Sequence, residues 1–173
     1  MKKIITITYL LFFVLTANYS NSEITLPFKN MSISKHPIEY KEILFKDYDG
    51  NTINLKDQKA KIYMLNFWAT WCVPCKKEMP YLDNLQNTNG IKIFPINIEK
   101  NNNFKAEIFF KSLEIKNLSI YFDIGTNLVN LFGLRGIPTT IILNKDRKEI
   151  ARVIGVVDFS DQKFISWISS ITN

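Results

Sequence analysis

Both cysteines of the chain lie within one short stretch, residues 67–80, whose sequence is FWATWCVPCKKEMP. The apolar run IYMLNF over residues 62–67 leads into this stretch and predicts a strand buried on both faces. Apolar residues then recur at helical spacing, which predicts a helix from Cys72 toward Gln86. Pro74 suits the first turn of this helix, where its missing N–H needs no partner. The cysteines are therefore expected at a strand-to-helix junction.

This position predicts the chemistry of Cys72. Unpaired N–H groups and the helix dipole favour negative charge at a helix amino terminus. Such surroundings lower the pKa of a cysteine from ~8.5 into a range of roughly 3.5–7.5, and the thiolate is the reactive form. We therefore expect Cys72 to be the exposed nucleophile. Cys75 follows one turn later on the same face and is placed to resolve a mixed disulfide formed by Cys72.

A purely structural disulfide and half of a zinc site are the alternatives for this cysteine pair. A loop this short restrains little chain entropy, which disfavours a structural role for the bond. A zinc site needs further ligands, and His36 is the single histidine. Reversible thiol–disulfide exchange is the favoured interpretation. Neither a metal nor another cofactor is predicted.

The amino terminus has the layout of an export signal. Two lysines precede an apolar run over residues 4–15, and small polar residues follow up to Ser22. The run is shorter than the ~20 residues that cross a bilayer comfortably. We therefore predict a signal peptide over residues 1–22, with an uncleaved membrane tether through residues 4–15 as the alternative. Export would place the cysteines outside the cytoplasm, in the periplasm or its equivalent, where disulfides persist.

The rest of the chain predicts one α/β domain. The chain has 173 residues and a net charge of +6. Of these residues 46% are hydrophobic, and this fraction excludes a disordered or collagen-like protein. The sequence contains no basic patch with aromatic stacking residues, and nucleic-acid binding is therefore not indicated. Residues 23–40 contain two prolines and no clear period, and are interpreted as a linker or surface arm. The domain is expected over residues 41–173.

Strands and helices alternate along this domain. Asp49-Gly50 predicts a hairpin turn, and Pro95 predicts a weakened or bulged strand. Pro80 is expected to kink the helix that contains it. The remaining predicted elements are a hairpin of residues 43–45 and 52–55, strands at 91–98 and 120–122, helices at 104–113 and 128–132, a terminal hairpin of strands 139–143 and 149–157, and a closing helix over 164–171.

Residues 67–80 resemble the active-site segment of the TlpA/ResA-type thiol–disulfide oxidoreductases, exported or membrane-tethered relatives of thioredoxin that include the CcmG-type proteins. Residues 133–140, GLRGIPTT, resemble the cis-proline segment of the thioredoxin fold. The resemblance covers roughly residues 40–160. It implies a thioredoxin-like fold, with a central mixed β-sheet flanked by helices, an amino-terminal β-hairpin, and a helix–strand insertion between Asn101 and Asp123.

The resemblance also implies roles for residues around the cysteines. The Ile137–Pro138 bond is expected to be cis and to lie against the two sulfurs, with the backbone of Ile137 offered to a substrate strand. Trp68 and Trp71 are expected to pack beside the disulfide. Trp71 and Pro74 are expected to contact the substrate as well.

Glu78 is the candidate proton acceptor. Thioredoxin has a buried aspartate at the position occupied here by Asn66, and the TlpA/ResA group instead has a glutamate three residues after its second cysteine. Cys75 and Glu78 share a helix face, so that the carboxylate could accept the Cys75 proton. The alternative is a solvated glutamate in a Lys-Lys-Glu run.

The resemblance implies an exported protein that reduces disulfides of client proteins, either apocytochrome c or a copper-delivery protein, with electrons from a membrane thiol–disulfide transporter. A thiol oxidase or disulfide isomerase is the alternative within the same chemistry. A Cu(I) chaperone is disfavoured because two sulfurs on one helical turn make a poor metal cage. A peroxidase of the peroxiredoxin type is disfavoured because the Pro-x-x-x-Thr-x-x-Cys spacing is absent.

Overall fold

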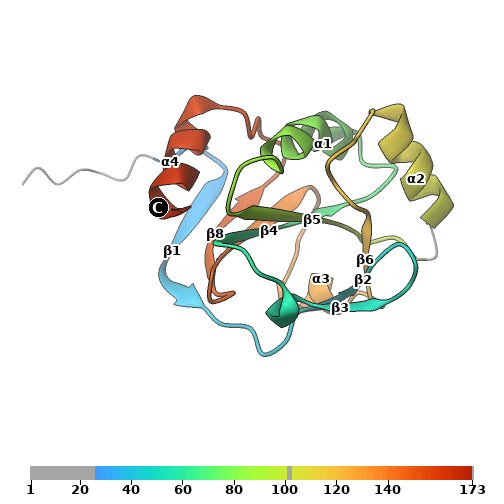
Figure 1. The fold of residues 1–173 in the computed structure, drawn as a ribbon, viewed down its shortest axis with the longest axis horizontal. Coiled ribbons are helices and arrows are strands. Elements are labelled where there is room, and N and C mark those ends of the chain that lie inside the picture. Colours follow the sequence, from blue (N-terminus) through green and yellow to red (C-terminus); the bar gives the residue numbers. More distant parts are fainter. Residues whose placement is uncertain (1–25, 101–102, 173) are drawn as a thin grey trace, which may run out of the picture.

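The computed structural model describes residues 26–100 and 103–172, and it arranges them around one mixed sheet (Figure 1). The strand order across this sheet is β1-β8-β7-β4-β5-β6-β2-β3. The strands are β1 (Met31–Ile38), β2 (Leu44–Lys46), β3 (Thr52–Asn54), β4 (Ile62–Trp68), β5 (Ile91–Asn97), β6 (Tyr121–Asp123), β7 (Thr139–Asn144) and β8 (Glu149–Ile154). The helices are α1 (Val73–Leu85), α2 (Asn103–Ser112), α3 (Asn127–Leu131) and α4 (Gln162–Thr172), with a 3-10 turn at Leu55–Asp57.

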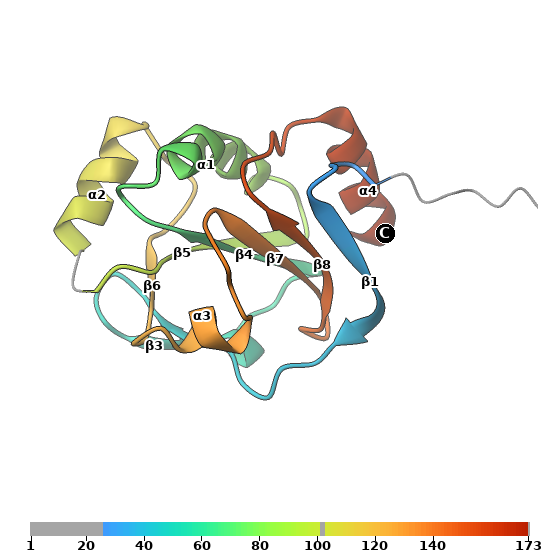
Figure 2. The ribbon, with the colours of Figure 1, turned by 180° about the vertical axis from the view of Figure 1, so that it is seen from behind.

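The central strand β4 is buried along its whole length because both faces of the sheet are covered. Its side chains alternate between two hydrophobic clusters, Met64 and Trp68 in one and Leu65 and Phe67 in the other. Helices α1, α2 and α4 cover the first face, and α3 covers the second (Figures 1 and 2). This arrangement accounts for the nearly continuous apolar run in the sequence.

The predicted insertion extends the sheet on one side. Its strand β6 pairs in parallel with β5 and antiparallel with β2, so that the β2–β3 hairpin continues the sheet beyond it. Gly50 has φ +87° in the hairpin turn, a conformation that glycine adopts without strain. The thioredoxin-like mixed sheet, the hairpin, the insertion and the closing helix are all confirmed.

The structure corrects several expectations about the strands. Residues 31–38, interpreted as part of a linker, form the edge strand β1, which pairs antiparallel with β8. The terminal hairpin is therefore not at the edge of the sheet, and β8 ends at Ile154, before the predicted residue 157. Pro95 causes no bulge toward β4, since the register is unbroken at the Asn66–Pro95 pair. Pairing with β6 begins only after this proline, at Ile96.

The described residues do not include the predicted signal peptide or its alternative, a tether through residues 4–15. They also do not include residues 23–25 of the predicted arm. Within residues 26–100 and 103–172, no helix has both the length and the apolar character needed to cross a membrane.

Candidate active site

The two cysteines form a disulfide at the amino terminus of α1. The S–S distance is 2.04 Å and the two Cα atoms are 5.3 Å apart. Cys72 is the residue that caps the helix, and the backbone N–H of Cys75 donates to its Sγ at 3.2 Å. The same N–H would be available to a Cys72 thiolate, which is the electrostatic environment predicted from the sequence.

The expectation that Cys72 is exposed is wrong for this disulfide-bonded form, in which only 4% of the residue is accessible. Its sulfur is tied back to Cys75 and joins the hydrophobic cluster under α1. The exposed positions are taken by its neighbours instead. Trp71 is 67% exposed, and Val73 and Pro74 are also exposed. A substrate therefore meets these side chains before it meets the sulfur.

The two tryptophans of the segment have different environments. Trp68 is fully buried, and its ring lies 4.6 Å from that of Phe109 and 5.4 Å from that of Phe110, both on α2. Trp68 belongs to the same cluster as the cysteines, whereas Trp71 points into solvent. The insertion helix α2 thus packs against Trp68, which shares a hydrophobic cluster with the cysteines.

The cis-proline segment lies at the start of β7. The Ile137–Pro138 peptide bond is cis, as the resemblance implies. Pro138 is buried and its carbonyl accepts from the N–H of Gly155 at 2.8 Å. The next residue, Thr139, pairs with Phe67 near the end of β4, which brings this segment beside the strand that leads to the cysteines. Ile137 is half-buried against both hydrophobic clusters.

Glu78 is buried, with 1% of its surface accessible, so the interpretation as a solvated glutamate is wrong. It lies on the inner face of α1, one turn after Cys75. Its Oε1 accepts from Asn66 Nδ2 at 2.7 Å, and its Oε2 accepts from the N–H of Val157 at 3.1 Å. Burial raises the pKa of Glu78 to about 7, and these two hydrogen bonds act in the opposite direction. The carboxyl therefore changes protonation near neutral pH.

Asn66 connects this carboxyl to the sheet. Its Nδ2 also donates to Thr140 Oγ1 at 2.9 Å, and the two residues are paired in register between β4 and β7. The amide thus uses both of its N–H groups and holds one carboxylate oxygen of Glu78 in place. Thioredoxin has an aspartate at this position, whereas this chain has Asn66, whose amide donates a hydrogen bond to the Glu78 carboxylate.

Glu99 is a residue that the sequence analysis did not select. Its carboxylate accepts from the N–H of Thr70 at 2.5 Å and from Thr70 Oγ1 at 3.0 Å, two residues before Cys72. Glu99 follows β5, whose last residue Asn97 pairs with Trp68 at the end of β4. The carboxyl ends of parallel strands meet at one edge of a sheet. From this rule, the sequence alone could have predicted that Glu99 lies close to the residues that precede Cys72.

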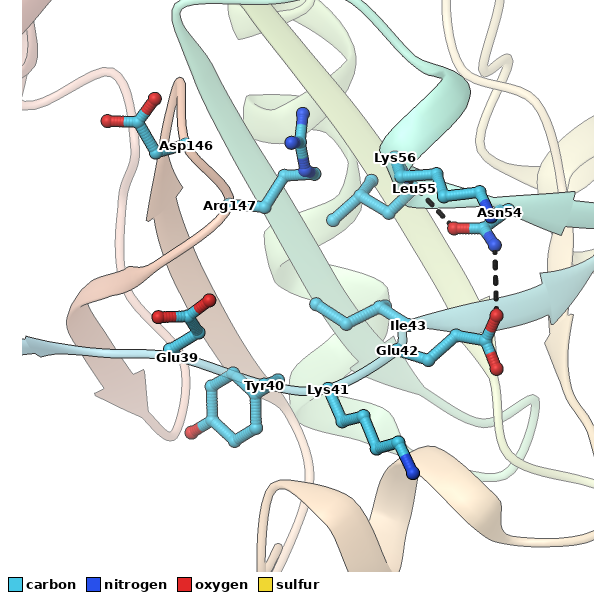
Figure 3. Close-up of a pocket in the computed structure, with 10 residues that line it drawn as sticks. All are labelled: Glu39, Tyr40, Lys41, Glu42, Ile43, Asn54, Leu55, Lys56, Asp146 and Arg147. Carbon is cyan, nitrogen blue, oxygen red and sulfur yellow. Dashed lines mark hydrogen bonds between the residues drawn. The ribbon is translucent and has the colours of Figure 1, made fainter.

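A hollow of about 240 Å³ lies at the opposite end of the sheet (Figure 3). Figure 3 shows it between residues 39–43, residues 54–56 and the β7–β8 turn. That turn follows Asn144, which pairs with Ile62 at the start of β4, whereas the cysteines follow the end of β4. None of the described residues that line the hollow is a cysteine. The redox chemistry is therefore not located there.

Comparison with known proteins agrees with this geometry. The Redoxin family profile matches residues 28–163. The thiol–disulfide oxidoreductase ResA of Bacillus cereus is 32% identical over 130 residues, which cover 73% of this chain and 72% of the relative. The chain belongs to the ResA-type thiol–disulfide oxidoreductases. The disulfide, the cis-proline segment and the buried Glu78 are therefore features of a ResA-type protein.

Solved structures share the fold of this ResA-type chain. A DsbF homologue from Corynebacterium diphtheriae is 26% identical, with a TM-score of 0.68 over 82% of this chain and 93% of its own. StoA from Bacillus subtilis is 26% identical, with a TM-score of 0.60 over 76% of this chain and 99% of its own. The thioredoxin-like architecture predicted from the sequence is thereby confirmed.

Proposed function

We propose that this ResA-type protein is an extracytoplasmic reductase of client disulfides that works through Cys72 and Cys75. The observation that carries the proposal is the buried Glu78, a carboxyl with a pKa of about 7 on the same helix face as Cys75. Reduction of a client requires that Cys75 lose its proton before it can attack. A carboxylate that titrates near neutral pH is suited to accept that proton and to release it again.

The reaction begins with the reduced protein. The Cys72 thiolate attacks one sulfur of the client disulfide, the client S–S bond breaks, and a mixed disulfide forms as the other client sulfur leaves as a thiolate. The Cys75 proton passes to Glu78. The Cys75 thiolate then attacks Cys72 Sγ and displaces the second client sulfur. Two electrons have moved to the client, whose two thiolates become thiols by taking up the proton held by Glu78 and one proton from solvent, and the protein holds the Cys72–Cys75 disulfide.

The exposed side chains around the cysteines support a role in client docking. Trp71 and Pro74 flank the buried disulfide on the solvent side. Ile137 precedes the cis bond, and its backbone is available to pair with an extended client segment in this proposal. The Pro138 carbonyl holds the segment to Gly155, just after β8, and the next residue, Thr139, pairs with Phe67 near the end of β4.

The reductive direction needs a supply of electrons, and the proposed donor is a membrane thiol–disulfide transporter. The signal over residues 1–22, or a tether through residues 4–15, would bring the domain to the outer face of the cytoplasmic membrane. Apocytochrome c and copper-site cysteines are the proposed clients. An oxidase would use the same residues with the electron flow reversed, and an isomerase would use them with no net transfer of electrons.

Mixed-disulfide trapping tests this proposal. The probe is a synthetic peptide with the disulfide of a Cys-x-x-Cys-His motif, which is the haem attachment sequence of c-type cytochromes. We expect the reduced wild-type protein to convert this peptide to its dithiol, Cys75→Ser to stop at a covalent adduct, and Cys72→Ser to form none. Mass spectrometry without reductant distinguishes the three outcomes. Full turnover by either variant would contradict the mechanism.

A further inference from the structure

The insertion helix α2 presents apolar side chains to solvent beside the disulfide site. Phe104 is 71% exposed and Ile108, one turn later, is 49% exposed. Figures 1 and 2 both show α2 next to α1 on one face of the sheet. The inner side of α2, with Phe109 and Phe110, supports Trp68. Phe104 and Ile108 lie on the outer side of the helix, where Glu107 accepts a hydrogen bond from the Tyr48 hydroxyl at 2.8 Å.

An open pocket connects this helix to the cysteine segment. It has a volume of about 280 Å³ and is lined by Thr70, Lys105, Ile108, Phe109 and Ser112. Thr70 lies two residues before Cys72, so the pocket includes a residue of the cysteine segment. The pocket is smaller than the roughly 300–1,000 Å³ of sites that enclose small-molecule ligands, and is suited to a single apolar side chain.

Exposed lysines flank the pocket and the cysteine segment. Lys76 and Lys77 are exposed on α1, and Lys105 is exposed at the pocket without an ion pair to any described residue. The nearby acids are already engaged, Glu99 by Thr70 and Glu107 by Lys111 at 2.6 Å. A partner that covers this surface would therefore be favoured by acidic side chains.

We propose that the α2 surface, formed by Phe104, Lys105, Ile108 and the pocket at Thr70, docks the client segment adjacent to its reacting cysteine. An apolar side chain of that segment enters the pocket, and an acidic residue faces Lys105. The inference rests on the proposed function, because it specifies the client chemistry for the same disulfide. The occupant is the client itself, since the pocket includes Thr70, two residues before the cysteine that the client has to reach.

Peptide disulfides of defined sequence test this docking. Each probe peptide carries one cysteine in a mixed disulfide with thionitrobenzoate. One set has a leucine and a glutamate a few residues from the cysteine, and a matched set has serine and lysine there. Attack of the Cys72 thiolate on the peptide sulfur breaks the mixed S–S bond and releases coloured thionitrobenzoate. The free aryl disulfide, Ellman's reagent, reports exchange without any docking segment.

We expect the wild-type protein to react faster with the leucine–glutamate peptides. Ile108→Ser should lower that rate by roughly fivefold to tenfold, the loss expected when one apolar side chain is no longer buried. Lys105→Glu should reverse the charge preference without changing apolar packing. Ile108→Ser should react normally with Ellman's reagent, whose two carboxylates make it unsuitable as a reference for Lys105→Glu. Ile38→Ser is the matched control, because Ile38 is 46% exposed and lies at the other end of the sheet.

Each failure has a distinct meaning. Equal rates for the two peptide sets, or an Ile108→Ser variant indistinguishable from wild type, would overturn the docking proposal alone. Loss of self-association by Ile108→Ser in sedimentation, with unchanged peptide rates, would assign the surface to contacts between copies of this chain and also overturn it. A reduced wild-type protein that releases no thionitrobenzoate even from Ellman's reagent would instead contradict the proposed function.

Discussion

Glu78 and Glu149 are carboxylates buried equally, each 1% exposed, at opposite ends of the central strands. Glu149, at the start of β8, accepts from the Arg152 guanidinium at 2.7 and 3.0 Å and also from the Tyr40 hydroxyl. Glu78, on the redox helix, accepts from the Asn66 amide and a backbone N–H, its only donors among residues 26–100 and 103–172. The two sites differ in the charge of their donors.

This difference in donor charge distinguishes Glu149, a structural carboxylate, from Glu78, a reactive one. A buried charge is tolerated when an opposite charge and hydrogen bonds compensate its lost hydration. Arg152 supplies that charge and also donates to the carbonyl of Phe132 at 3.1 Å, so that the cluster ties the segment after β1 to the sheet. No described residue supplies a cation to Glu78, and burial raises its pKa to about 7. The fold thus keeps a proton-exchanging group beside the cysteines.

The largest effect is expected at the structural end. Arg152→Met leaves Glu149 buried without its cation, which should lower the free energy of unfolding by ~3–5 kcal/mol. Urea unfolding at pH 7 measures this loss. Arg152→Lys, which keeps a charge but not the two-point contact, should lose less. The reaction of the folded protein with Ellman's reagent should be unchanged. A loss below ~1 kcal/mol would mean that the two carboxylates are equivalent.

The stability of the redox end should depend on pH in a defined direction. The folded pKa of Glu78 lies above its ordinary value of 4.5, so the folded state binds the extra proton and its stabilising effect is complete below pH 4.5. The effect is lost as the pH rises to about 7.

Glu78→Gln removes this dependence. The stability of the variant relative to wild type should therefore rise across that window, by up to ~3 kcal/mol at ~1.4 kcal/mol per pKa unit. Urea unfolding from pH 4 to pH 8 tests it, with Glu114→Gln as the exposed control. A constant difference between wild type and variant would contradict the raised pKa.

Glu78→Gln should also slow the resolution of the mixed disulfide, by ~10²-fold at neutral pH, the lower range for loss of a general base. In the wild type the rate should rise as the pH passes about 7, because the carboxylate is the accepting form. The variant should lack that inflection. Stopped-flow measurement of peptide release as a function of pH provides both quantities. An unchanged profile would remove Glu78 from the mechanism.

A smaller effect is expected for Asn66. Asn66→Ala removes a hydrogen bond to the Glu78 carboxylate that lowers its pKa, so the inflection should move to higher pH. The cost in stability should be about 2 kcal/mol, at about 1 kcal/mol for each of the two hydrogen bonds that Asn66 donates. Thr140→Val is the matched control, because it removes the other partner of Asn66 and leaves the Glu78 contact. An inflection that shifts equally in both variants would show that the contact with Glu78 is not specific.

The parts of the fold that sequence reasoning predicted are those with strong local patterns. The continuous apolar run of β4 and the helical spacing after Cys72 each determine an element on their own. Strand β1 has no such pattern, because at the edge of the sheet most of its residues are exposed, and it includes Pro37. Its pairing with β8 is a contact between distant parts of the chain.

The site was predicted to a similar extent. The cysteines and the cis-proline segment are recognisable from motifs, and Glu78 from its spacing to Cys75. The burial of Glu78 could not be predicted from a Lys-Lys-Glu run, because it depends on Asn66 and Val157, which come from other elements of the fold. The buried cluster of Glu149 with Arg152 and Tyr40 escaped prediction for the same reason.

The reduction potential of the Cys72–Cys75 pair tests the proposed reductase most directly. The mature domain is equilibrated in thiol redox buffers, and the redox state is followed by the fluorescence of Trp68 and Trp71, which flank the cysteines. We predict a value near or below about −250 mV, close to that of thioredoxin, which suits a reductase supplied with electrons from the membrane. A value near about −120 mV would identify a strong oxidant and contradict the reductive function.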